Sequence, residues 1–363
     1  METEGFYMAE KRWRTWETVG LLVVLAAGNL LHFIYDWTGQ SPIAAPLAAV
    51  NESTWEHMKL FITPWVLWSL VECIALRGHG ALLQKTVQRA GELGAIPAVF
   101  TFDRPPKEVV TGRPMPLINS PEDRADLARR IYGIQQVILA PFDEAMMTMP
   151  WQDFITELLV KRHGAVHLVA GHDYHFGYKN QGDPRLLQEK CRELGLGCDI
   201  IPKVELEGVT VSSTYIRTLV EAGDVERAAL FLGHRHCLTQ TVVHGHRLGR
   251  TLGIPTVNLT FPPHVLAPRR GVYITRVYLP DGTSLAGVTN VGTRPTVSEG
   301  TAVSVETFLL DFDGDLYGKR IRVEFCRRLR DEQKFDSLEA LKAQIRENIR
   351  QTRDYFAAES TRG

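Results

Sequence analysis

The sequence has few cysteines, almost no net charge and no long block of charge of one sign. Its 363 residues carry a formal net charge of −1 without a basic tail, which argues against nucleic acid as the main partner. The five cysteines are scattered and form no CxxC pair, so we expect reduced thiols rather than a disulfide framework or a zinc site. A Walker A phosphate loop is also missing, because the nearest match, GDLYGKR, lacks one spacer residue and ends in arginine. Any use of ATP therefore needs another phosphate loop.

The composition is that of a protein with well-packed cores, with 44% apolar and 23% charged residues. At roughly 100–200 residues per domain, the length predicts two or three domains. We predict a multidomain chain with boundaries at 1–76, 77–236 and 237–363.

The first region is unusually apolar. Residues 18–35 contain no charged side chain and reach the lower limit of roughly 17–25 residues for crossing a bilayer. A weaker run at 60–76 is interrupted by Glu72. Because basic residues precede the first run and none lies between Trp16 and Met58, we predict a transmembrane helical hairpin with the catalytic domains in the cytoplasm. This hairpin would contact the lipid bilayer. A cleaved signal peptide and a buried soluble hairpin are the alternatives.

Two segments of this region carry a resemblance. HFIYDWTG (32–39) and VNESTWEHMKL (50–60) resemble the opening of a family of uncharacterised bacterial multi-span membrane proteins, which has no known chemistry to lend. Glu56 and His57 suggest either a metal site or an amphipathic turn at the membrane interface.

The second region alternates between helical and strand patterns. Apolar residues have helical spacing over 81–94, and Ser120 with an acidic first turn predicts a helix over 120–133. Buried-strand runs occur at 96–102, 135–142 and 166–171. This order predicts a parallel, doubly wound α/β sheet of the Rossmann-like kind. Ligands of such sheets bind at the carboxyl ends of the strands, near helix N-termini.

Three polar clusters lie at such positions. They are RGHG (77–80), AGHDYHFGYKNQG (170–182) and VSSTYIRTLVEAGD (211–224). The three hydroxyls at 212–214 precede a helix that carries Arg217 one turn in, an arrangement suited to a triphosphate. Taken alone, the same hydroxyls are also typical of an ordinary helix cap.

Together with FTFDRPPKE (100–108) and GDVERAALFLGH (223–234), these clusters resemble the adenylyltransferase module of bacterial bifunctional flavin-cofactor synthetases. The resemblance covers roughly residues 78–236. It implies a Rossmann-like fold and the transfer of AMP from ATP onto FMN, which gives FAD and pyrophosphate. It also implies a nucleotide and FMN site made of His79, Asp173, Phe176, Ser212, Ser213, Thr214 and Arg217.

The front of this module departs from the family. The family begins with a strand, a phosphate loop and His-x-Gly-His, and that frame falls here on Leu76, Arg77, Gly78 and His79. Leu76 cannot donate the hydrogen bond of the first histidine, and the apolar run stands where the strand and loop belong. Losing one preorganised donor costs ~10²–10³ in rate, so we predict impaired adenylyl transfer. An error of gene prediction near Glu72 is the alternative, and the protein would then be cytoplasmic.

The third region has the pattern of a small antiparallel β-barrel with a terminal helix. Short alternating runs are bounded by Gly, Pro and Asp, and the pair Asp281–Gly282 predicts a hairpin. The last segment, residues 337–356, has apolar residues at helical spacing.

A phosphate site is predicted at the start of this barrel. Glycines let backbone N–H groups approach phosphate, so we assign the ATP loop to Gly245, Gly249, Arg250 and Gly253. Thr256 and Asn258 offer oxygen ligands suited to Mg²⁺ and share one face of a strand. Glu306 could accept the proton of an attacking alcohol. Each feature alone could equally be an ordinary turn or a solvent-facing strand residue.

The combination is more specific. PTVN, NVGTRPT, VETFLLDFDGDLYG and R-x-E-x-K-F occur in order, and roughly residues 238–356 resemble bacterial riboflavin kinase. The resemblance implies that Thr256 and Asn258 bind Mg²⁺–ATP and that Glu306 deprotonates the terminal ribityl hydroxyl of riboflavin. It implies a flavin site or closing flap made of Asn290, Arg294, Arg330, Glu332 and Phe335.

The predicted small molecules are therefore ATP with Mg²⁺, together with riboflavin, FMN and FAD as substrates and products. A zinc site at the pairs His234/His236 and His244/His246 is a minor alternative, because no Cys or carboxylate completes it. A membrane-tethered flavin-binding or scaffold protein with decayed enzymatic modules is the alternative of another class.

Overall fold

The computed structural model describes residues 80–244, 255–262, 264–295 and 301–360, all of which belong to the unit Gly78–Gly363. The predicted membrane hairpin lies outside these residues. Among the helices of the described ranges, none is long and apolar enough to cross a membrane.

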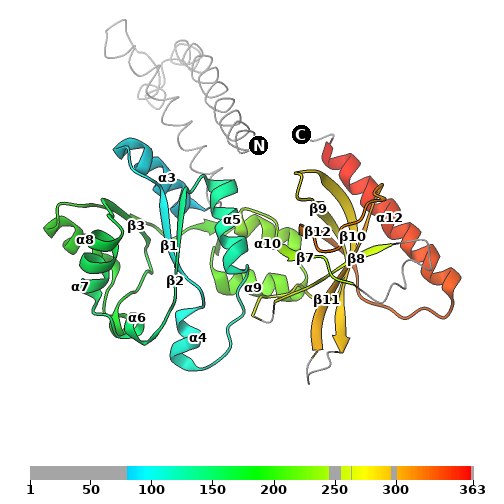
Figure 1. Ribbon diagram of the computed structural model, residues 1–363, viewed down its shortest axis with the longest axis horizontal. Coiled ribbons are helices and arrows are strands. Elements are labelled where there is room, and N and C mark those ends of the chain that lie inside the picture. The colour runs from blue at the N-terminus through cyan, green and yellow to red at the C-terminus, as the bar shows by residue number, and fades with distance from the viewer. Residues whose placement is uncertain (1–79, 245–254, 263, 296–300, 361–363) are drawn as a thin grey trace, which may run out of the picture. The chain divides into compact units, whose positions relative to one another are not determined.

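The first half of the described chain alternates helices and strands in the predicted order (Figure 1). Helix α3 begins after Gly80 and ends at Gly94, both of which have left-handed backbones that favour glycine. Helix α5 begins as predicted, because the Ser120 hydroxyl accepts the N–H of Asp123 at 3.0 Å. The elements are α3 (Ala81–Leu93), β1 (Ala98–Phe102), α4 (Pro106–Thr111), α5 (Pro121–Tyr132), β2 (Gln136–Ala140), α6 (Glu144–Thr148), α7 (Trp151–Asp153), the π-helix η1 (Phe154–Arg162), β3 (His167–Gly171), the 3₁₀-helix η2 (Tyr178–Asn180), α8 (Pro184–Glu193), β4 (Gly197–Ile201), β5 (Glu205–Leu206) and β6 (Val209–Thr210).

The parallel strands form two separate pairs instead of one doubly wound sheet. Strand β1 pairs with β2, and β3 pairs with β4. Within the described ranges no hydrogen-bonded strand joins the two pairs. The doubly wound sheet that the sequence predicts is therefore seen only as these two pairs among the described residues. In the sequence, an apolar run stands where the family's first strand belongs, and that run lies outside the described residues.

Two helices, α9 (Ser213–Ala222) and α10 (Val225–Leu232), follow this half of the chain. Their apolar faces pack together through Ile216, Leu219, Val220, Ala228 and Phe231, all at most 8% exposed. These helices lead directly into the first barrel strand.

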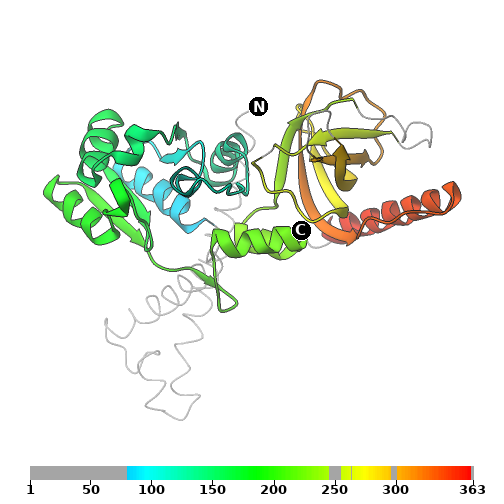
Figure 2. The same cartoon turned by 90° about the horizontal axis from the view of Figure 1, so that it is seen from below.

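The last part of the chain is a nearly closed antiparallel barrel (Figure 2), which confirms the predicted architecture. The strand order is β7 (Cys237–Thr241), β12 (Arg320–Arg330), β9 (Gly271–Tyr278), β10 (Ser284–Pro295), β11 (Thr301–Leu309) and β8 (Thr256–Thr260). The two outer strands meet where the N–H of Val243 donates to the carbonyl of Asn258 at 2.9 Å. The predicted hairpin joins β9 to β10, and Asp281 accepts the N–H of Thr283 in its turn.

The terminal helix α12 (Leu338–Ser360) lies against the outside of the barrel (Figure 2). Ile349 packs on a small apolar cluster that contains Val272, Val288 and Leu310. Near the end of the helix, Glu359 accepts hydrogen bonds from Arg276 at 2.6 Å and from Arg235. Part of the outer barrel surface is therefore covered, and the remainder is available for a site.

Candidate active sites

Three predicted kinase residues lie side by side on neighbouring strands. Asn290 of β10 is opposite Glu306 of β11, and Glu306 is opposite Asn258 of β8. The next row, Val291, Val305 and Leu259, is at most 1% exposed and fills the barrel interior. Since successive strand residues face opposite sides, the polar row lies on the outer face of the sheet.

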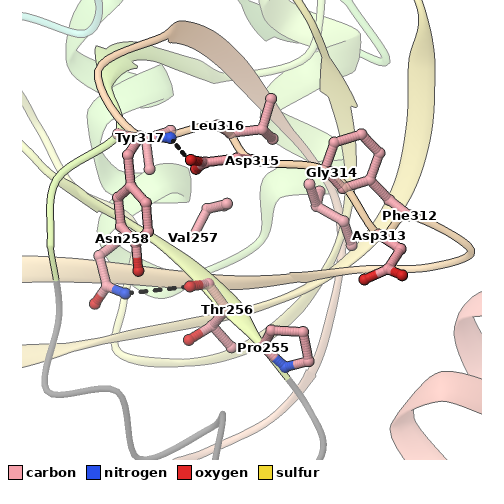
Figure 3. Close-up of a pocket in the computed structure, with 12 residues that line it drawn as sticks. Pro255, Thr256, Val257, Asn258, Phe312, Asp313, Gly314, Asp315, Leu316 and Tyr317 are labelled. Atoms are coloured by element: carbon pink, nitrogen blue, oxygen red, sulfur yellow. Dashed lines mark hydrogen bonds between the residues drawn. The ribbon is translucent and has the colours of Figure 1, made fainter.

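Thr256 and Asn258 also line a cavity of about 430 Å³ at the end of β8 (Figure 3). The Asn258 side chain is 5% exposed, and its amide nitrogen donates to the Thr256 carbonyl at 3.4 Å. Val257, between them, packs against the apolar core of the barrel. The alternation that the sequence predicts is therefore present, with two oxygen-bearing side chains on the side away from the core.

The far wall of the cavity comes from the turn after β11, to which the sequence analysis gave no function. Phe312, Asp313, Asp315 and Tyr317 line it (Figure 3). Asp315 accepts the N–H of Tyr317 at 3.0 Å, and the Tyr317 ring lies 4.0 Å from that of His244. The sequence carried one signal that this turn belongs to the site, because the turn directly follows the strand of Glu306.

The predicted flap residues are partly brought to this row. Glu332 accepts a hydrogen bond from the Asn290 amide at 3.3 Å. The Arg330 guanidinium lies 5.7 Å from the centre of the Phe335 ring, so these two side chains support each other. Arg294 lies in β10, but its side chain is outside the described atoms, as are Gly245, Gly249, Arg250 and Gly253.

The donor set of this site suits a hard cation carried by a nucleotide. A threonine hydroxyl and an asparagine carbonyl oxygen are ligands that Mg²⁺ accepts, and Mg²⁺ commonly keeps the substrate phosphates as further ligands. The Asp313 carboxylate lines the same cavity. Glu306, directly opposite Asn258 in the sheet, is half-buried and close enough in register to serve a reaction at that cation.

Of the three hydroxyls at 212–214, the helix-cap interpretation describes that of Ser212. The Ser212 oxygen accepts the N–H of Tyr215 at 3.2 Å, which makes it the N-cap. Arg217 donates to the Pro116 carbonyl at 3.0 Å and to the Ser213 hydroxyl at 3.2 Å. Thr214 is exposed. Two donors of Arg217 are thus held by the protein itself, and a role in gripping phosphate stays a prediction.

The segment after β3 holds one core residue and one surface residue. Phe176 is 5% exposed and packs among Trp151, Phe154 and Tyr174, so its side chain is part of the hydrophobic core. The side chain of Asp173 is 83% exposed. Burial raises the pKa of Tyr174 to about 12. In this structure Phe176 shapes the loop, and its role in the nucleotide and FMN site stays a prediction.

The structure describes the chain only from the residue after the broken histidine motif. His79 lies outside the described residues, whereas Gly80, which follows it, has φ 72°, and a Cβ atom there would clash with the Tyr132 ring. The glycine is required both by its backbone conformation and by this close approach.

One member of the predicted histidine pairs, His236, is a buried structural residue. His236 is fully buried beside Phe261 and Phe325, whose ring centres lie 6.3 and 5.8 Å from its own, and its ring bonds the Leu266 carbonyl at 3.1 Å. Burial lowers its pKa to about 4. His246 is outside the described residues, and within them no group of three or more His, Cys, Asp or Glu side chains could hold a metal ion.

Comparisons with known proteins agree with this division of the chain. Residues 232–356 match the riboflavin kinase family, residues 76–215 match FAD synthetase, and residues 6–85 match a family of unknown function (DUF6512). The last two matches overlap over residues 76–85, which locates the joint at the broken motif.

The relatives and solved structures that match cover the second and third regions. The chain is 36% identical to the bifunctional riboflavin kinase/FMN adenylyltransferase of Pseudomonas fluorescens, over 79% of this chain and 91% of the relative. It is 37% identical to the Escherichia coli K12 protein of the same name, over 77% and 89%. A crystal structure described as a macrolide-efflux protein from Streptococcus pneumoniae is similar with a TM-score of 0.66 and 29% identity, covering 77% of this chain and 90% of that one.

Proposed function

We propose that this chain, which belongs to the family of bifunctional riboflavin kinase/FMN adenylyltransferases, differs from the family by having a working kinase and an impaired adenylyltransferase. The kinase phosphorylates riboflavin with ATP to give FMN. The adenylyltransferase module would transfer AMP from ATP onto FMN to give FAD.

The row Asn258–Glu306–Asn290 supports the kinase assignment. Thr256 and Asn258 would hold Mg²⁺ with the ATP phosphates, and the cation would neutralise charge that develops during phosphoryl transfer. Glu306 would accept the proton of the ribityl hydroxyl as that oxygen attacks the γ-phosphate. Asn290 and Glu332, which are hydrogen-bonded to each other, would orient the flavin side of the site.

Two observations support impairment of the second activity. Leu76 replaces a histidine that would stabilise charge on the phosphates, and leucine has no hydrogen-bond donor. The described parallel strands form two pairs without a strand that joins them. If no strand of the preceding segment joins the pairs, the module would lose part of the sheet edge at which its ligands bind.

A product assay tests both halves of this proposal. The full chain would be supplied with ATP, Mg²⁺ and either riboflavin or FMN, and the flavins separated by chromatography. We expect FMN from riboflavin and little FAD from either substrate. Glu306→Gln should lower FMN formation by ~10²–10⁴-fold, whereas the exposed carboxylate variant Glu339→Gln should not.

Each outcome has a distinct meaning in this assay. FAD formed from FMN as fast as FMN from riboflavin would show that Leu76 and the replaced strand are tolerated. No FMN from wild-type chain would favour the flavin-binding or scaffold alternative. The retained activity of Glu339→Gln controls for folding.

A membrane anchor at residues 18–35 and 60–76 is a separate proposal that rests on the sequence alone. Extraction of membranes with alkaline carbonate tests it. An integral hairpin would leave the chain in the pellet, and release into the supernatant would remove the anchor from the proposal.

A further inference from the structure

We propose that Thr289 and Thr307, two buried threonines of the barrel, are positioning residues for the kinase reaction. Their hydroxyls belong to a hydrogen-bonded ladder that fixes the alignment of strands β10 and β11 under the kinase row Asn258–Glu306–Asn290. The inference rests on the proposed kinase function of that row. It concerns side chains that face the barrel interior and not the site.

The ladder crosses three neighbouring strands. The Thr275 hydroxyl of β9 lies 2.7 Å from that of Thr289 in β10, which lies 2.8 Å from that of Thr307 in β11. All three residues are 0% exposed. A hydroxyl carries one donor and two acceptors, so the central threonine can donate to one neighbour and accept from the other. The hydroxyls therefore serve as one another's partners at a depth closed to bulk water.

The surroundings of the ladder are apolar. Val291 and Val305, the next inward-facing residues along β10 and β11, are 0% exposed members of the barrel core. Gly287, directly opposite Thr275, leaves room for the ladder, because a Cβ atom there would lie 2.8 Å from the Thr275 oxygen and 2.9 Å from a methyl carbon of Thr307. Valine has nearly the shape of threonine and avoids the cost of burying a hydroxyl. Space filling alone therefore does not explain the three hydroxyls.

The ladder ties the register of two strands to the geometry of the kinase row. Thr289 lies directly opposite Thr307, and the pair next to them is the outward-facing pair of the row. A shift of β11 by two residues would keep the inward and outward faces, but it would bring a valine or a leucine opposite Thr289. The hydroxyls would then lose their partners inside the core, which disfavours the shift. The threonine pair therefore specifies the register that places Glu306 beside Asn290.

Alignment of this row bears directly on the rate. Phosphoryl transfer depends on positioning, and misplacement by about 1 Å can cost ~10²-fold. Glu306 is held between Asn290 and Asn258 by the register of β11 with its two neighbours. Loss of the Thr307 hydroxyl would release the backbone that carries Glu306. Thr275 differs, because neither of its chain neighbours belongs to the row and its removal leaves the bond between the other two threonines in place.

Two matched variants test the proposal. Thr307→Val and Thr275→Val each remove one end of the ladder and one of its hydrogen bonds. When the full chain is supplied with riboflavin, ATP and Mg²⁺, Thr307→Val should lower kcat for FMN formation by about 10-fold and change KM for riboflavin by less than about twofold. Thr275→Val, and Thr307→Ser, which keeps the hydroxyl, should both stay within about twofold of the wild-type kcat. Thermal unfolding should show that all three variants fold.

A double variant separates positioning from general damage. If Thr307 acts through Glu306, Thr307→Val should cause little further loss in a Glu306→Gln background. Equal kcat losses in the two valine variants, no loss in either, no rescue by serine, or an additive loss in the double variant would overturn the proposal. Failure of the proposed function looks different, because the wild-type chain would then form no FMN, or Glu306→Gln would form it at the wild-type rate.

Discussion

The barrel and the parallel strand pairs of this chain differ in how fully they are buried. In β9, the residues Val272, Tyr273, Ile274 and Val277 are at most 5% exposed, whereas every residue of β1 is only half-buried. Parallel strands are ordinarily buried on both faces, so the partial exposure of parallel strand β1 is unexpected, and antiparallel β9 is the more deeply buried of the two. The barrel closes on itself, and the described part of the parallel region does not.

The difference teaches that the two modules depend on sequence in different ways. Each barrel strand finds its partners within residues 237–330, and the seam between Val243 and Asn258 removes the free edges. The described parallel strands form two pairs that no described strand joins. Under the proposed function, replacement of the segment before residue 80 would affect the parallel module and leave the barrel working.

The largest expected effect is a gain of adenylyl transfer. A chimera in which residues 1–79 are replaced by the first strand and histidine loop of the Pseudomonas fluorescens relative should form FAD from FMN ~10²–10³-fold faster, because both the donor and the strand return. FMN formation from riboflavin should not change. Leu76→His supplies the imidazole without the strand and should recover much less. If the chimera gains nothing, the defect lies elsewhere in the module.

A pH effect on the barrel should follow from His236. The pKa of this buried imidazole is lowered to about 4, below the ordinary value of about 6.5 in the unfolded chain. Between these values the unfolded state binds a proton that the native state does not, so stability is lost as pH falls from 6.5 to 4. The loss should approach about 3 kcal/mol.

Hydrogen exchange of β12 amides at pH 7 and pH 4.5 would measure this loss. His236→Gln keeps an N–H donor for the Leu266 carbonyl but does not titrate, so its stability should fall less over the same interval. Equal falls in both proteins would assign the pH dependence to carboxylates instead. Strands β1 and β2 should show no difference between the two proteins.

A smaller effect is expected at the cation site. Thr256→Ala removes one oxygen ligand and should lower kcat/KM for Mg²⁺–ATP by about 10-fold or more, since a hydrogen bond or ligand to a charged group is worth roughly 1.5–3 kcal/mol. Thr260→Ala is the matched control, because Thr260 lies on the same strand and face but does not line the cavity. An equal loss in both variants would indicate damage to β8 rather than loss of a ligand.

The sequence predicts the barrel better than the parallel sheet, for a physical reason. Alternation within each strand and the Asp281–Gly282 turn are local signals, and they identify β9, β10 and the outward positions of Thr256 and Asn258. Which strands become neighbours is non-local. The arrangement of β1–β2 and β3–β4 as two pairs is such a non-local property, so no local pattern predicts it.

The candidate kinase site was likewise only partly predictable from the sequence. Its strand residues follow from motif and alternation, but the cavity wall at Phe312, Asp313 and Tyr317 comes from a turn that no periodicity marks. Phe176, an aromatic residue in a motif, lies in the hydrophobic core, and its predicted contact with nucleotide or FMN stays a prediction. Motif membership alone does not distinguish a ligand contact from a residue that holds the loop in shape.

The smallest expected effect compares one substitution in the two modules. Val323→Ala in β12, where the side chain is 0% exposed, should reduce the stability of the barrel by about 2 kcal/mol through lost burial and a cavity. Val99→Ala in half-buried β1 should cost about 1 kcal/mol or less, because the methyl groups already contact water. Hydrogen exchange of β12 and β1 amides resolves the two modules separately. If both substitutions cost the same, β1 is covered in the whole protein as fully as a barrel strand. The contrast between the modules would then lie in the lost imidazole at position 76 rather than in the sheet, and Leu76→His should recover most of the adenylyl transfer.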